Sequence, residues 1–66
     1  MSSTPITAAD LRREIRWLER EISHYRADLV RITDPGQRQR VVAVVAELEQ
    51  RLADKRRELA TMEGRG

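Results

Sequence analysis

The feature that most constrains the fold is a spacing of three and four residues between apolar side chains, which runs through both halves of the chain. Residues at these spacings form one narrow stripe on a helix, and such a stripe is usually buried against a second helix. Asp34-Pro35-Gly36 divides the two series. Because proline disfavours helical geometry in the residue before it, we expect a short break there, and a short break makes the two helices antiparallel neighbours. The sequence therefore predicts an all-α fold, an antiparallel two-helix hairpin of the heptad coiled-coil type.

Capping signals give the expected boundaries of the two helices. Thr7 is a candidate N-cap, and Asp10 lies three residues later, where its carboxylate can complete a capping box. Asp34 is the candidate N-cap of the second helix, with Gln37 in the answering position. We predict one domain, divided into a flexible N-terminus at 1–6, a first helix at 7–33, a tight turn with its N-cap at 34–37, a second helix at 38–63 and a flexible C-terminus at 64–66.

The apolar stripe is the predicted oligomer core, because its residues occupy the a and d positions of the seam between helices. These residues are Leu11, Ile15, Leu18, Ile22, Tyr25, Leu29, Ile32, Val41, Val45, Leu48, Leu52, Leu59 and Met62. Placing Ile32 opposite Val41 brings opposite charges together along one edge of the seam. The predicted pairs are Arg12 with Glu63, Glu19 with Arg56, and Arg26 with Glu49.

Lys55 fills the one core position that the apolar series skips. One interpretation is that its stem packs on Leu18 while the ammonium group reaches toward Glu19, Glu58 or Asp54. The other is that a polar core residue fixes the register or the oligomeric state.

The small size of the chain favours self-association. The hydrophobic core that a chain of 66 residues can form is marginal, and there is no Cys to form a stabilising disulfide. In a lone hairpin, each residue of the stripe has only one neighbouring helix and would be only partly covered. Apolar residues also lie outside the stripe, notably a valine cluster around the start of the second helix. The candidate interface residues are Trp17, Val30, Val42, Val44, Ala46, Ala53 and Ala60. We therefore expect a homodimer, with a tetramer as the alternative, that forms an antiparallel four-helix bundle.

Charge gives a second candidate surface. Lys and Arg number 13 and Asp and Glu number 11, which indicates a solvated helical surface more than a polycation. Arg13, Arg16 and Arg20 nevertheless form a stripe and are the candidate nucleic-acid residues. Trp17 beside them could lie along its own hairpin under an arginine, anchor a protein interface, or stack on single-stranded nucleic acid. In layout, the chain resembles the Rop type of dimeric hairpin, and this resemblance implies an RNA-binding regulator as the alternative function.

Other motifs predict no catalytic or metal site. Glu21 and His24 have the Glu-x-x-His spacing of di-iron bundles, but they lie beside the seam, with Arg51 facing Glu21. Residues 11–22, LRREIRWLEREI, resemble the opening helix of helical chorismate mutases. That resemblance covers one helix of a larger fold, and we do not expect the activity here. Nothing in the sequence pairs a nucleophile with a base, so we expect no cofactor and no enzymatic function.

The longest apolar run is six residues, at 41–46, whereas a membrane span needs about 20. The N-terminal residues also lack the pattern of a signal peptide. We therefore expect a cytoplasmic protein with no membrane partner. Its expected function is protein–protein binding, as a homo-oligomeric adaptor, scaffold or accessory subunit of a larger assembly.

Overall fold

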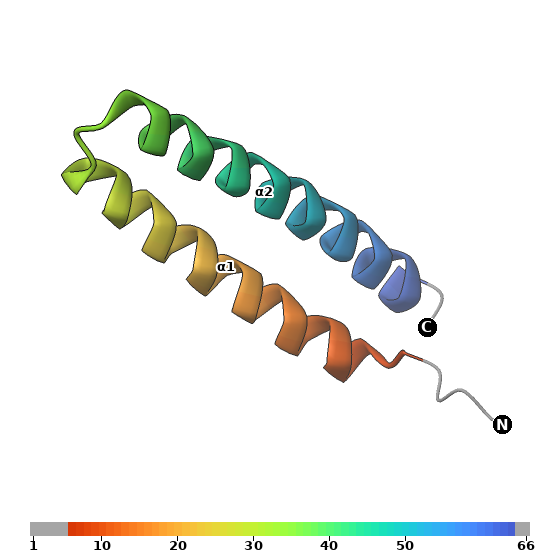
Figure 1. Cartoon of the computed structure of the whole chain (residues 1–66). Helices are drawn as coiled ribbons and strands as arrows, with labels where there is room; N and C mark the ends of the chain where they lie inside the picture. Colours follow the sequence, from red (N-terminus) through yellow and green to blue (C-terminus); the bar gives the residue numbers. More distant parts are fainter. Residues whose placement is uncertain (1–5, 65–66) are drawn as a thin grey trace, which may run out of the picture.

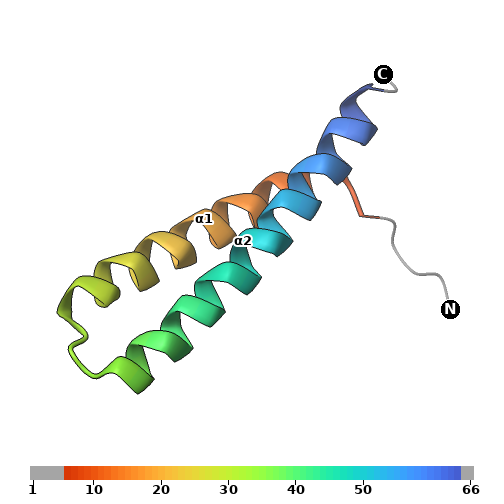
Figure 2. The ribbon, with the colours of Figure 1, turned by 90° about the horizontal axis from the view of Figure 1, so that it is seen from above.

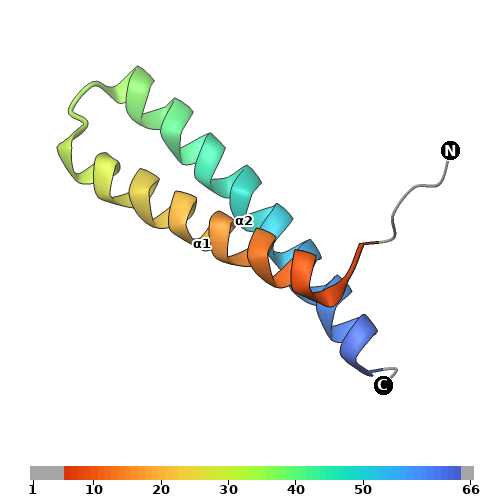
Figure 3. The same cartoon turned by 90° about the horizontal axis from the view of Figure 1, so that it is seen from below.

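The computed structural model describes residues 6–64, which form two helices that pack against each other in a hairpin (Figure 1). Helix α1 spans Ala8–Arg31 and helix α2 spans Pro35–Gly64. The molecule is elongated, 47 × 29 × 14 Å along its principal axes. Seen from above and from below, the two helices cross at a shallow angle (Figures 2 and 3). The all-helical hairpin predicted from the apolar spacing is confirmed. Of the predicted termini at 1–6 and 64–66, residues 1–5 and 65–66 lie outside the described residues, and Gly64 is the last residue of α2.

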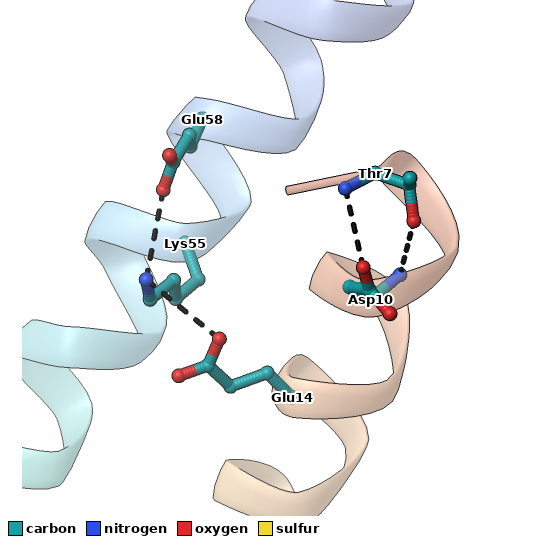
Figure 4. A network of polar contacts seen from close by, with 5 residues as sticks. All are labelled: Thr7, Asp10, Glu14, Lys55 and Glu58. Carbon is teal, nitrogen blue, oxygen red and sulfur yellow. Dashed lines mark hydrogen bonds and ion pairs between the residues drawn. The ribbon is translucent and has the colours of Figure 1, made fainter. Parts of the chain in front are cut away.

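A capping box sets the start of α1. Thr7 is extended, with φ −96° and ψ 164°, and its Oγ1 accepts a hydrogen bond from the Asp10 N–H at 3.1 Å. In return, the Asp10 Oδ2 accepts from the Thr7 N–H at 3.3 Å (Figure 4). Two N–H groups that would otherwise lack partners at the helix start are thereby satisfied. The predicted capping box is confirmed.

The connection between the helices is shorter than the sequence predicted. Helix α1 ends at Arg31, followed by an extended Ile32, and α2 begins at Pro35, three residues before the predicted start. The Asp34 Oδ2 accepts a hydrogen bond from the Gln37 N–H at 2.8 Å. Because this hydrogen bond satisfies an N–H group of the first turn and proline suits the first helical position, the helix can begin directly after Asp34.

One contact at the turn was not predicted from the sequence. The Arg38 Nη1 of α2 donates to the Leu29 carbonyl oxygen at 2.8 Å and to the Ile32 carbonyl oxygen at 3.4 Å. The last carbonyls of a helix have no partner within the helix, and a cation there also suits the helix dipole. A side chain from α2 therefore caps the end of α1.

The core lies in the seam between the helices. Its main cluster consists of Ile15, Leu18, Ile22, Val45 and Leu52, and Leu11 is buried as well. Leu11 and Leu18 are 0% and 2% exposed, so the expectation that one neighbouring helix gives only partial cover is wrong for this part of the seam.

Met62 departs from the predicted core, because it is 37% exposed. It lies near the end of α2, beside the first turn of α1, where little chain remains to cover it.

Candidate interaction surfaces

One edge of the seam carries a row of ion pairs between the helices. The three predicted pairs are all present: Arg12 with Glu63, Glu19 with Arg56, and Arg26 with Glu49. The latter two pairs line a shallow hollow together with Ile22 and Leu52. Because the apolar stems of arginine can cover hydrophobic surface, these paired side chains help to explain why the seam beneath them is buried. We call this row the ion-pair edge.

Lys55 holds the opposite edge together. Its Nζ lies 3.7 Å from the Glu14 Oε2 and 3.7 Å from the Glu58 Oε2 (Figure 4). The two carboxylates face each other across the seam, so without the lysine they would repel. The contact with Glu58 agrees with the predicted reach of the ammonium group, whereas the contact with Glu14 was not predicted.

Burial along the hairpin is uneven. Of the six buried hydrophobic residues of the described chain, three lie in the first half of α1 (Leu11, Ile15 and Leu18), two lie near the middle of the hairpin (Ile22 and Leu52), and Val45 lies toward the turn. Beyond Ile22 toward the turn, Val45 is the one buried core residue among the described residues. The remaining core positions there are only partly buried, namely Tyr25, Leu29, Ile32, Val41 and Leu48. The seam is therefore most fully buried along the first half of α1 and less covered toward the turn, while Leu59 and Met62 near the end of α2 are also incompletely covered.

The most exposed valines lie in the same turn-proximal half. Val30 is 85% exposed, Val42 48% and Val44 37%. By heptad position, Val30 and Val42 lie on the side of the ion-pair edge, and Val44 lies on the side of Lys55. In the same half, Tyr25, Ile32 and Val41 contribute to a hollow of about 430 Å³ at the turn, whose lining does not include these three valines. We call Val30, Val42 and Val44 the turn-end surface.

The other predicted interface residues lie elsewhere. Ala46, Ala53 and Ala60 are exposed along one side of α2, and Trp17 is 51% exposed on α1. Trp17 precedes Val30 by 13 residues on the same helix, a separation of about 20 Å along the axis. The structure therefore does not bring Trp17 into the turn-end surface.

The three candidate nucleic-acid arginines share one region of α1 with Trp17. Arg13, Arg16 and Arg20 are exposed, and together with Trp17 they occupy neighbouring positions over two helical turns. We call these four residues the Arg–Trp patch.

The Glu-x-x-His motif is open to solvent. The His24 Nδ1 lies 4.0 Å from the Glu21 Oε2, and the two side chains are 69% and 30% exposed. Arg51 pairs with Glu47 at 3.2 Å and not with Glu21 as the sequence analysis suggested. Within residues 6–64, no group of three or more His, Asp and Glu side chains is placed to hold a metal ion.

Neither helix, over the part of the chain that the structure describes, combines the length and apolar character needed to cross a membrane. The chain matches no protein-family model, no curated protein and no solved structure. Its function must therefore be argued from the exposed surfaces themselves.

Proposed function

We propose that this hairpin is a non-enzymatic cytoplasmic protein that works by protein–protein binding, as a homo-oligomeric adaptor, scaffold or accessory subunit of a larger assembly. In this proposal two copies associate through the turn-proximal half and complete an antiparallel four-helix bundle. The observation that carries the proposal is the uneven burial of the seam, which leaves the turn-end surface uncovered.

The turn-end surface suits a second copy because of where its residues lie. In a twofold interface, each residue of the patch is buried twice, once in each copy. Full burial of one valine contributes about 1.5 kcal/mol or more, so burial of these three valines, two on the side of the ion-pair edge and one on the side of Lys55, gains appreciably from such duplication. Partly covered residues of the seam, such as Tyr25 and Leu48, would be covered further by the same contact.

The alanines on α2 support close packing of another helix beyond the turn. Ala46, Ala53 and Ala60 recur at intervals of seven residues, so they fall on one line along the helix. A line of small side chains lets a second backbone approach closely, although alanine is also simply the best helix former. This row therefore supports the proposal only in combination with the valines.

The test is the native mass by light scattering coupled to size exclusion, at micromolar concentration and moderate salt. We expect two chains for the wild-type protein and one chain for the double variant Val42→Glu with Val44→Glu. Both positions are exposed, so the glutamates are compatible with the hairpin, and circular dichroism checks that the helices remain. A matched control, Ser23→Glu with Gln50→Glu, adds the same charge at exposed positions outside the turn-end surface and should keep the wild-type mass.

Two results would contradict the proposal. A wild-type protein that is folded at the mass of a single chain would show that the hairpin needs no second copy. A double variant that keeps the wild-type mass would show that the turn-end surface is not the interface.

A further inference from the structure

The outer face of α1 carries more positive than negative charge. The residues that point away from α2, at heptad positions b, c and f, are Ala9, Asp10, Arg13, Arg16, Trp17, Arg20, Ser23, His24, Ala27, Val30 and Arg31. Apart from Asp10, the acidic residues of α1 lie at other positions, nearer the seam or on the side of Lys55. Although the net charge of the chain is only +2, this face therefore carries three arginines within the eight residues 13–20 and no acidic residue among its positions there.

The carboxylates nearest the three arginines are already engaged. Asp10, one turn before Arg13, is held in the capping box with Thr7. Glu19, one turn after Arg16, pairs across the seam with Arg56. Within residues 6–64, Arg13, Arg16 and Arg20 have no ion-pair partner, so their guanidinium groups remain available to an external anion.

Trp17 lies beside these cations with half of its surface exposed. The residues one turn away on either side, Arg13, Glu14, Arg20 and Glu21, are all charged. A protein partner would therefore meet a single aromatic anchor with no apolar neighbours. A nucleic-acid base needs only one exposed ring on which to stack, and guanidinium groups bind the adjoining phosphates with paired hydrogen bonds.

We propose that the Arg–Trp patch binds single-stranded nucleic acid, with a base stacked on Trp17 and phosphates held by Arg13, Arg16 and Arg20. The site goes beyond the proposed self-association and is separate from it, because it lies toward the opposite end of α1 from the turn-end surface. In a dimer the patch occurs twice, so one strand can contact two copies.

Trp17 itself provides the first measurement, because it is the only Trp of the chain. A uridine-rich 15-mer is titrated into the full-length protein at 50 mM salt, and Trp17 emission is followed. Stacking should quench the emission along a saturable curve. Absence of any change up to 100 times the protein concentration would overturn the proposal.

Salt dependence then tests the arginines, with a fluorescein-labelled 15-mer followed by anisotropy. Three phosphates neutralised on a single strand give a log–log slope of about −2, so affinity should fall about 20-fold between 50 and 200 mM salt. For Arg16→Gln with Arg20→Gln, we expect the fall to shrink to about threefold. The control Arg40→Gln with Arg57→Gln removes the same charge from α2 and should keep the steep dependence. An equal effect of the two double variants would show that only net charge matters and would overturn the site.

Two further arms separate the proposed ligand from other partners. Trp17→Leu keeps an apolar helix former but removes the ring, and should weaken oligonucleotide binding about five- to 100-fold. A poly-glutamate peptide of matched charge should bind at least tenfold more weakly than the oligonucleotide. Equal binding of the peptide would assign the patch to an acidic protein and not to nucleic acid.

The outcome is distinguishable from that of the self-association test. The variant Val42→Glu with Val44→Glu should still quench Trp17 emission on addition of the 15-mer, whatever its native mass. Loss of quenching in that variant would contradict the separation of the two surfaces.

Discussion

Among single residues, Lys55 shows how one side chain can occupy a core position without being apolar. It lies in the stripe opposite Leu18, yet its Nζ reaches Glu14 and Glu58, one on each helix. The side chain is 27% exposed, so the ammonium group keeps contact with water while its stem lies in the seam. The lysine thereby joins the helices at a point where two carboxylates would otherwise repel each other.

We predict that Lys55→Gln lowers the free energy of unfolding by about 0.5–1 kcal/mol at low salt, because two partly exposed ion pairs are lost and two carboxylates are left facing each other. Urea denaturation followed by circular dichroism measures this change. In 1 M NaCl the difference should largely disappear. Arg57→Gln is the control, since Arg57 has no ion pair within residues 6–64. Equal stability of Lys55→Gln and wild type at low salt would contradict a stabilising role for the bridge.

At the scale of the two helices, the contacts at their ends set where each helix begins and ends. Thr7 and Asp34 cap the starts of α1 and α2, as their sequence positions predict. The end of α1 is capped differently, by Arg38 from the first turn of α2. This side chain joins the last carbonyls of one helix to the next helix, so it fixes the direction in which α2 leaves the turn.

We predict that Arg38→Met costs about 1 kcal/mol of stability, since it removes charge-assisted hydrogen bonds but keeps a long stem and good helix propensity. Thermal or urea unfolding provides the measurement. Arg40→Met, two residues later and outside any such contact among the described residues, should change stability by less than about 0.5 kcal/mol. If the two variants are equally stable, the Arg38 cap does not stabilise the turn.

The elements also show what the sequence could predict and what it could not. The capping box of α1, the Asp34 N-cap of α2 and the ion-pair edge follow from fixed offsets along a helix and from one choice of register, so sequence spacing predicts them. The contacts of Arg38 depend on where the turn places α2 beside α1, and no local offset encodes that placement. The near-complete burial of Leu18 was missed for a similar reason, because Leu18 packs in a cluster with residues of both helices, among them Val45 and Leu52 of α2.

In the whole molecule, the two ends of the hairpin differ in how complete they are. Toward the start of α1, Leu11, Ile15 and Leu18 are buried, although Met62 near the end of α2 is 37% exposed, whereas the turn end exposes Val30, Val42 and Val44. If two copies cover this surface in a dimer, the stability of the folded protein should rise with protein concentration, because association favours the folded state.

We predict that the melting temperature rises by about 5 °C when the protein concentration is raised tenfold, for example from 10 to 100 μM, because unfolding of a dimer of this size is coupled to dissociation. Differential scanning fluorimetry or circular dichroism provides the measurement. The melting temperature of Val42→Glu with Val44→Glu should be lower and independent of concentration. A wild-type melting temperature that does not change over this range would contradict self-association as the source of stability.

The three-residue connection between α1 and α2 has a consequence for how the chain can be altered. A surface loop is usually the place where a protein best accepts added residues. Here the connection carries the Asp34 cap, receives the Arg38 side chain and adjoins the uncovered valines. An insertion at the turn would disturb all three, whereas a tag or fused domain joined at either end of the hairpin would leave the cap, the Arg38 contacts and the exposed valines in place. We therefore expect the turn of this molecule to tolerate added residues less well than the two ends of the hairpin do.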